Sequence, residues 1–188
     1  MTAPIRQPNL FLIVLPLIAG VLLIDQITKF IAIDTLCLLA DATSCSSLTG
    51  IPLDQAPIVH QPARSTFFPL IDLQFSLNPN AALSMPIPGP EWFEHVLLLS
   101  IMAVLAGWLW REGGRNNALG VGLILGGALG NYADRLMHGA VVDFLVPNLG
   151  FSPFIFNVAD SAITVGVIWL FIEQLALKPR RQAEAVVS

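Results

Sequence analysis

The hydrophobic pattern of the chain consists of four long apolar segments separated by polar stretches. A segment of about 20 apolar residues is needed to cross the hydrocarbon core of a bilayer. Four segments come close to that length, at approximate positions 10–33, 95–110, 118–135 and 158–177. The pattern predicts an all-α membrane protein with four transmembrane helices, forming one domain over residues 1–188. The first segment is long for the apolar part of a signal peptide and contains Asp25, so we expect it to be an uncleaved span.

The long polar stretch between the first two spans, 34–94, contains a second kind of pattern. Apolar and polar residues alternate over "IDLQFSL", residues 71–77, which is the period of a half-buried strand. We expect a small β element near 65–77 on the outer surface, with 65–68 as the partner strand. The segment 137–156 is interpreted as a second outer loop.

The composition agrees with the membrane class. Charged residues make up 12% of the chain, about half of the roughly 25% found in soluble domains. The mean hydropathy is +0.72. No run of basic residues indicates nucleic-acid binding.

The placement of basic residues predicts the orientation in the membrane. Lys and Arg gather in short cytoplasmic loops. They lie before the first span, between the second and third, and after the fourth: Arg6, Arg111, Arg115, Lys178, Arg180 and Arg181. The stretch 34–94 has Arg64 as its one basic residue. Both termini are therefore expected in the cytoplasm, with 34–94 and 137–156 on the outer side.

Four carboxylates fall near one depth, the outer interface, in this orientation: Asp25, Asp134, Asp143 and Asp160. Ionisable residues are expensive in a bilayer and commonly mark a functional site. Asp25 and Lys29 are four residues apart and share a helix face, so we expect them to pair, with a structural role favoured.

The third span carries a polar group at its outer end. Asn131 and Asp134 are three apart and share a face, whereas Arg135 points elsewhere. Arg135 is compatible with two roles, an interfacial anchor or a planar fork that holds a substrate carbonyl or a lipid phosphate. The sequence leaves both open.

Asp143 and Asp160 are candidates for acid–base chemistry. Asn157 is a plausible N-cap, and Asp160 three residues later completes a capping-box pattern, so Asp160 alone is compatible with a purely local role. Asp143 lies in an apolar context at the same depth. Two carboxyls close together in a dry site do not both ionise easily, and such a dyad can activate water. We predict that Asp160, at a helix N-terminus, is ionised and that Asp143 is protonated.

Other chemistries have weaker support. The three histidines are scattered and the cysteines lack zinc spacing, so we expect no metal and no cofactor. Cys37 and Cys45 both face outward in the predicted topology. A disulfide and two free thiols are both compatible with the sequence.

Five motifs in fixed order resemble the lipoprotein signal peptidase (signal peptidase II) family. They are "DQITKF", "NPNAALSM", "GGALGNYADRL", "GAVVDF" and "FNVADSA". The resemblance extends over roughly residues 10–177. It implies a bacterial inner-membrane aspartyl protease with four spans and a small extracytoplasmic β-cradle. Such an enzyme cleaves prolipoproteins on the N-terminal side of a diacylglyceryl-modified cysteine, at the outer face of the membrane, and globomycin inhibits it.

The resemblance also implies roles for individual residues. Asp143 and Asp160 would form the catalytic dyad. The substrate-binding residues would be Asn78, Asn131, Arg135 and Asn157. Asp25, Lys29 and Asp134 would support the structure. The expected partners are diacylglyceryl-modified prolipoproteins, membrane lipids and globomycin-type inhibitors, and a monomer is expected.

Two departures from the family pattern leave alternatives open. Asn80 replaces the usual glycine and Leu83 the usual aromatic residue after the strand, and the stretch 33–65 is longer than usual. An inactive relative that binds lipopeptides without cutting them therefore remains an alternative. A proton-coupled carrier is a second one, although a carrier is expected to place its polar groups nearer the membrane midplane.

Overall fold

The computed structural model describes residues 10–37, 65–68, 70–78, 91–112, 114–148 and 154–177. Four long helices dominate it. Their bounds are Phe11–Ala32 (α1), Glu91–Glu112 (α4), Arg115–His138 (α5) and Val158–Ile172 (α6). Short π-helical turns, Ile33–Cys37 (η1) and Glu173–Leu177 (η4), continue α1 and α6. The four predicted helical segments are confirmed, with ends that differ by a few residues.

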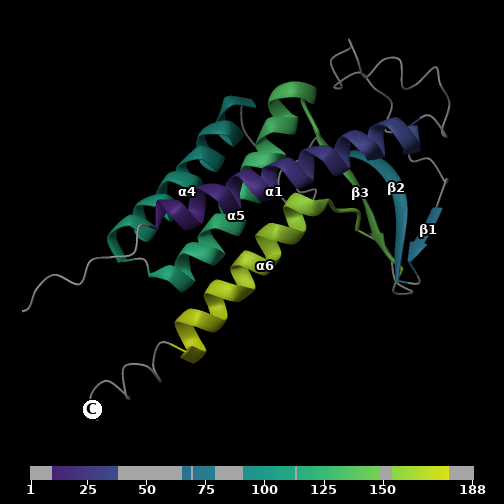
Figure 1. Ribbon diagram of the computed structural model, residues 1–188. Coiled ribbons are helices and arrows are strands. Elements are labelled where there is room, and N and C mark those ends of the chain that lie inside the picture. The colour runs from purple at the N-terminus through teal and green to yellow at the C-terminus, as the bar shows by residue number, and fades with distance from the viewer. Residues whose placement is uncertain are drawn as a thin grey trace, which may run out of the picture.

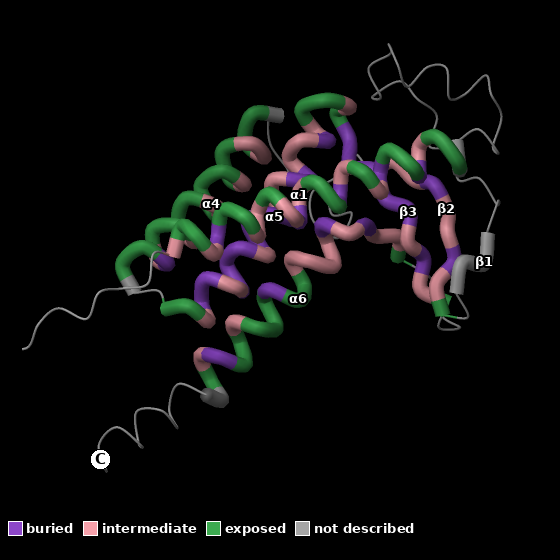
Figure 2. The backbone as a smooth tube through the Cα atoms, viewed as in Figure 1, coloured by how far each residue is buried: buried purple, intermediate pink, exposed green. Residues whose placement is uncertain are grey.

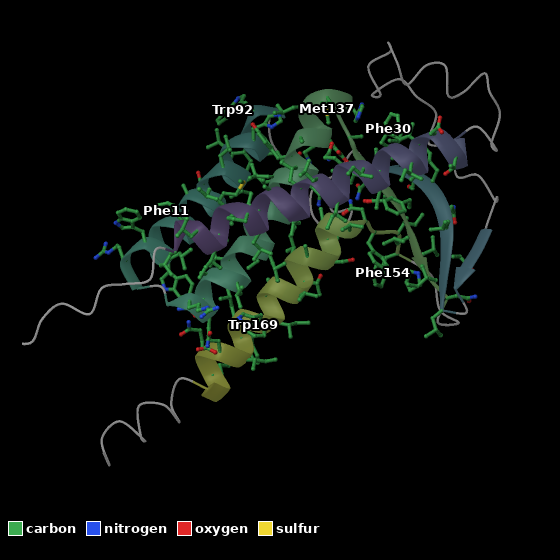
Figure 3. All side chains as sticks on the ribbon, in the orientation of Figure 1. Phe11, Phe30, Trp92, Met137, Phe154 and Trp169 are labelled. Atoms are coloured by element: carbon green, nitrogen blue, oxygen red, sulfur yellow. The ribbon has the colours of Figure 1, made fainter. Side chains whose placement is uncertain are left out.

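Helix α5 is the centre of the bundle. It packs against α1, α4 and α6, and Figure 2 shows buried positions along much of its length, whereas α4 is largely exposed. The sheet lies at one end of the bundle, near the end of α1 and the start of α6 (Figure 1). The large aromatic side chains Phe11, Phe30 and Trp92 point outward from the helices (Figure 3) and are 50% to 70% exposed.

Three of the four helices are long and apolar enough to cross a membrane, over Phe11–Thr35, Trp92–Arg111 and Val158–Leu175. Helix α5 is less apolar, since its sequence contains many glycines and polar residues that face the other helices. Three membrane-spanning candidates are therefore found among the described residues, and a fourth crossing by α5 remains a prediction.

Glycines bring α5 close to its neighbours. A Cβ on Gly127 would collide with the backbone carbonyl oxygen of Ala159 in α6, and a Cβ on Gly126 would lie 2.8 Å from the Cβ of Val21 in α1. Small residues let transmembrane helices approach at backbone distance. This close packing brings the polar side chains of three helices within hydrogen-bond range of one another.

The sheet has three antiparallel strands in the order β1-β2-β3, with bounds Ser65–Phe68, Ile71–Asn78 and Val141–Pro147. The first two strands were predicted. The third was not: the segment 137–156 was expected to be a loop. Strand β3 is an apolar run whose partner β2 lies far earlier in the chain, as in the pairing of Val141 with Asn78, 63 residues before it. Such a short apolar run has no period that distinguishes a strand from other buried structure.

The inner face of the sheet is held by an apolar cluster. Phe75 of β2 and Phe144 of β3 pack with Val142 and with Ala32 at the end of α1. This cluster anchors the sheet on the helices, and it fixes the position of Asp143, between two of these buried residues on β3. Cys45, Asn80 and Leu83 lie outside the described residues.

Candidate active site

A buried ion cluster joins α1 to α5. The Lys29 ammonium lies 2.8 Å from Asp25 Oδ2 and 2.8 Å from Asp134 Oδ2. All three side chains are at most 3% exposed. The predicted pair of Asp25 and Lys29 is confirmed, and Asp134 is the third member. Buried carboxylates are tolerated when they are paired and their remaining lone pairs are satisfied.

The lone pairs of this cluster are satisfied by other elements. Asp25 Oδ1 accepts from the backbone N–H of Ala159 at 2.8 Å, at the start of α6. Asp134 Oδ2 accepts from the backbone N–H of Val142 in β3 at 3.0 Å. Gln26 Nε2 donates to Asp134 Oδ1 at 2.9 Å. The cluster thus fixes α6 and β3, the two elements that carry Asp160 and Asp143.

Two buried amides connect the ion cluster to these aspartates. Asn131 Oδ1 accepts from Lys29 Nζ at 3.0 Å, and Asn131 Nδ2 donates to Asp160 Oδ1 at 2.8 Å. Asn157, which is fully buried, donates through Nδ2 to Asn131 Oδ1 at 3.0 Å and to Asp143 Oδ1 at 2.7 Å. The amide of Asn157 is therefore shared between α5 and β3.

Asp160 has a second role at the start of α6. Its backbone N–H donates to Asn157 Oδ1 at 2.9 Å, and its Oδ2 accepts from the Asn157 N–H at 3.2 Å. This is the predicted capping box. Its other oxygen, Oδ1, is bound by Asn131. The carboxylate thus serves the helix terminus and also belongs to the polar network, so the two interpretations of Asp160 are compatible.

The Asp143 carboxyl accepts hydrogen bonds from two neutral amides. Asn78 Nδ2 donates to Asp143 Oδ2 at 3.2 Å, opposite the bond from Asn157 to Oδ1. Burial, reinforced by the negative charge of Asp160, raises the pKa of the Asp143 carboxyl to about 7. The hydrogen bonds from Asn78 and Asn157 lower it and only partly offset these effects. Near neutral pH this carboxyl therefore exchanges a proton readily.

A cavity of about 560 Å³ opens beside these groups. Its polar lining comes from α5, β2, β3 and α6, and includes Asn78, Asn131, Arg135, Asp143 and Asp160. Its apolar lining includes Val141, Phe154, Phe156, Ile163 and Val165. Phe154 lies between the start of α6 and the sheet (Figure 3). The cavity lining thus combines charged and amide side chains with apolar ones.

Arg135 is the one basic residue of the cavity lining in the described part of the chain. Its Nη1 donates to the backbone carbonyl of Asn131 at 3.1 Å, and its Nε lies 2.8 Å from Glu94 Oε1 of α4. The side chain is 10% exposed. Of the two roles left open by the sequence, the position of Arg135 in the cavity wall favours contact with a ligand.

All nine residues singled out from the sequence belong to one connected region. Asp143, Asp160, Asn78, Asn131 and Arg135 line the cavity, whereas Asn157 lies behind it. The ion cluster of Asp25, Lys29 and Asp134 lies behind Asn131. Gln26 and Glu94 were missed. Gln26 is adjacent to Asp25 in the first motif, whereas the role of Glu94 depends on a contact between helices that has no signal in the sequence.

The fold and this region define a class: an integral membrane protein with a carboxylate-lined cavity at the sheet end of a helix bundle. The family model for signal peptidase (SPase) II matches residues 17–176. The chain therefore belongs to the signal peptidase II family. Family membership and the apolar helices define a bacterial inner-membrane protease, and they support the cleavage of prolipoprotein signal peptides.

Individual relatives agree with this assignment. The lipoprotein signal peptidase of Rhizorhabdus wittichii is 40% identical over 121 residues, which cover 61% of this chain and 70% of that protein. The lipoprotein signal peptidase of Sphingopyxis alaskensis is 35% identical over 172 residues, covering 88% of this chain and 87% of that protein. Two solved structures of a bacterial membrane enzyme, determined by the in meso method at 2.3 Å and 1.9 Å, are similar in fold. Each has a TM-score of 0.64 and 25% identity, and they cover 86% and 87% of this chain and 86% and 93% of theirs.

Proposed function

We propose that the chain is an aspartyl endopeptidase that removes signal peptides from prolipoproteins by cutting on the N-terminal side of the diacylglyceryl-modified cysteine. One observation carries the mechanism. Asp143 and Asp160 both line one cavity, and the amides of Asn157 and Asn131 hold them from behind. This is the arrangement needed for two carboxyls to share the acid and base roles in water activation.

The chemistry follows from the different environments of the two carboxyls. Asp160 lies in the first turn of α6, at the positive end of the helix dipole. Asp143 has a pKa raised to about 7 and carries the proton. Asp160 removes a proton from water, whose oxygen attacks the scissile carbonyl carbon. Asp143 donates a hydrogen bond to the developing oxyanion. The C–N bond then breaks and the leaving amine receives the proton from Asp160. The products are a carboxylic acid, which keeps the second proton of the water, and the amine of the modified cysteine; proton exchange between them then gives a carboxylate and an ammonium group.

The remaining cavity residues bind and orient the substrate. Asn78 holds Asp143 from the sheet side, and Arg135 presents N–H groups to a substrate carbonyl. The apolar wall that includes Phe154 and Val165 suits the acyl chains of a lipidated peptide. Asp25, Lys29 and Asp134 are structural supports of the dyad. No metal or cofactor takes part in this mechanism.

The topology completes the proposal. Helix α5 also crosses the membrane, which brings the number of spans to four. Both termini are cytoplasmic, and the site opens at the outer face. This places the scissile bond of a lipid-anchored substrate at the interface, where water is available. The partners are prolipoproteins and membrane lipids, globomycin-type compounds inhibit, and the enzyme works as a monomer.

The first test is cleavage of a diacylglyceryl-modified prolipoprotein by the detergent-purified chain. Asp143→Asn and Asp160→Asn should each lose at least about 10³-fold in rate, because each removes an acid–base group. Asp72→Asn is the matched control, since Asp72 is also a buried aspartate of the sheet but does not line the cavity. It should cleave at close to the wild-type rate.

Two results would overturn the proposal. An uncut substrate in the presence of folded wild-type protein would favour a relative that only binds lipopeptides. Near wild-type cleavage by either Asn variant would reduce that aspartate to a structural residue.

A further inference from the structure

The ion pair between α4 and α5 is a feature that the proposed mechanism does not use. Glu94 lies in the first turns of α4, and its Oε1 is 2.8 Å from Arg135 Nε. The Glu94 side chain is 25% exposed and the Arg135 side chain 10%. At this burial an ion pair is screened less than a surface pair. Glu94 itself is not part of the cavity lining.

Two contacts from different neighbours hold the Arg135 guanidinium. Nε lies 2.8 Å from Glu94 Oε1 of α4 in an ion pair, and Nη1 donates to the Asn131 carbonyl of α5. Because the guanidinium is rigid and planar, holding two of its nitrogens on different neighbours sets the direction of the whole group. Loss of Glu94 would remove one of the contacts that restrict this long side chain, so more of its conformational freedom would be lost when a ligand binds.

A second contact reinforces the same junction. His95 follows Glu94 on α4, and its ring meets Tyr132 of α5 edge-on, with centroids 5.6 Å apart and an interplanar angle of 79°. Tyr132 is three residues before Arg135, so it lies one turn away on the same helix. The start of α4 is thus joined to α5 by a charged and an aromatic contact, next to the cavity.

We propose that Glu94 is a positioning residue of the peptidase: it holds the Arg135 guanidinium in the orientation that binds the substrate. This inference rests on the proposed function, in which Arg135 contacts a substrate carbonyl. Glu94 touches neither the substrate nor the two aspartates. Its effect is transmitted through Arg135, so it should alter substrate binding more than the chemical step.

The variant Glu94→Gln tests this role. It keeps the size and removes the negative charge that pairs with Arg135, and we expect KM to rise about tenfold because the guanidinium loses this partly buried ion pair. The value of kcat should stay within about twofold, because a contact made equally in ground and transition states affects KM alone. Glu94→Asp, which keeps the charge on a shorter side chain, should fall between Gln and wild type.

A double-mutant cycle separates positioning from a merely structural role. In an Arg135→Ala background, Glu94→Gln should raise KM by less than about twofold, because its target is gone. Glu173→Gln is the matched control, since it makes the same charge-removing change at a glutamate on η4, far along α6 from the cavity. It should leave KM unchanged. Equal loss in both backgrounds, or a fall in kcat together with the unfolding temperature, would overturn the inference.

A binding measurement keeps this test independent of turnover. The dissociation constant of a diacylglyceryl-modified peptide is measured in an Asp143→Asn background, with and without Glu94→Gln. A tenfold weaker affinity supports positioning even if the wild-type chain cleaves nothing, a result that would reject only the proposed function. Unchanged affinity, with normal cleavage by wild type, would reject the role of Glu94 alone.

Discussion

Two groups of aspartates lie side by side in this molecule and have opposite surroundings. Asp25 and Asp134 share the ammonium of Lys29 and are sealed inside the helix bundle. Asp143 and Asp160 are held by the neutral amides of asparagines and line the cavity. The first two carboxylates are occupied by the ion pairs and by backbone N–H groups, away from the cavity. A carboxyl held by amides next to a cavity can gain and lose a proton, which is what acid–base chemistry requires.

The comparison teaches how one chain brings four acids into one connected region and gives them different partners. The two groups of aspartates differ in their partners, a lysine for the first group and asparagine amides for the second. The asparagines also connect the two groups. Asn131 touches Lys29 on one side and Asp160 on the other. The ion cluster therefore supports the positions of Asp143 and Asp160, because it is hydrogen-bonded to the elements that carry them.

Loss of the cation should have the largest effect. Lys29→Met leaves Asp25 and Asp134 buried without their counter-charge, which should cost about 3–5 kcal/mol of stability. The measurement is the yield and the thermal unfolding of the detergent-purified protein. Adding Asp25→Asn and Asp134→Asn to the same chain should recover part of the loss. Wild-type stability in the single variant would contradict the assignment of a paired, structural cluster.

The next largest effect should be a pH dependence of stability that comes from Asp143. The folded-state pKa of Asp143 is raised to about 7, above its unfolded value of about 3.9. The folded state therefore binds more protons between these values, and stability falls as pH rises from about 4 to about 7. Asp143→Asn cannot titrate, so its unfolding temperature should decline less across this range. Identical slopes for the two proteins would contradict a raised pKa.

The same pKa predicts a loss of activity on the alkaline side. If Asp143 must carry the proton, the cleavage rate should fall as pH rises above about 7. A rate profile measured with a fixed lipidated substrate checks this. A rate that keeps increasing well above pH 8 would exclude a protonated Asp143 in the reactive state.

The smallest effect on stability is expected from adding a methyl group at a glycine next to the ion cluster. A Cβ on Gly130 would lie 2.6 Å from Asp25 Oδ2, so Gly130→Ala pushes on the ion cluster and should cost about 1–3 kcal/mol. Gly107→Ala is the matched control, because nothing lies within 4 Å of its added Cβ. It should be neutral or slightly stabilising in thermal unfolding. Equal behaviour of the two variants would show that the cluster tolerates displacement.

Much of the bundle could be predicted because its signals are local. The apolar runs predicted the helices, and the alternation over 71–77 predicted a strand. The i, i+4 spacing of Asp25 and Lys29 predicted their contact. The capping box of Asn157 and Asp160 was equally readable. Each of these depends on residues within a few positions of one another, and steric and hydrogen-bonding rules act directly at that range.

Strand β3 could not be predicted, and the reason is physical. Its residues pair with β2 across a long sequence separation and are buried by the ends of the helices. No periodicity within seven residues reveals such a partner. The same is true of Glu94, whose ion pair with Arg135 depends on how α4 is placed against α5.

The sequence by itself determined the membrane class, the four helical segments and the identity of the acids that gather near one depth. Only the tertiary structure decided which acids meet a cation and which meet amides. The partner of each acid depends on the close helix contacts that the glycines of α5 allow, and on the register of β3 against β2. Charge partners are selected by positions in space, and residues far apart in the chain acquire those positions only when the helices and the sheet pack together.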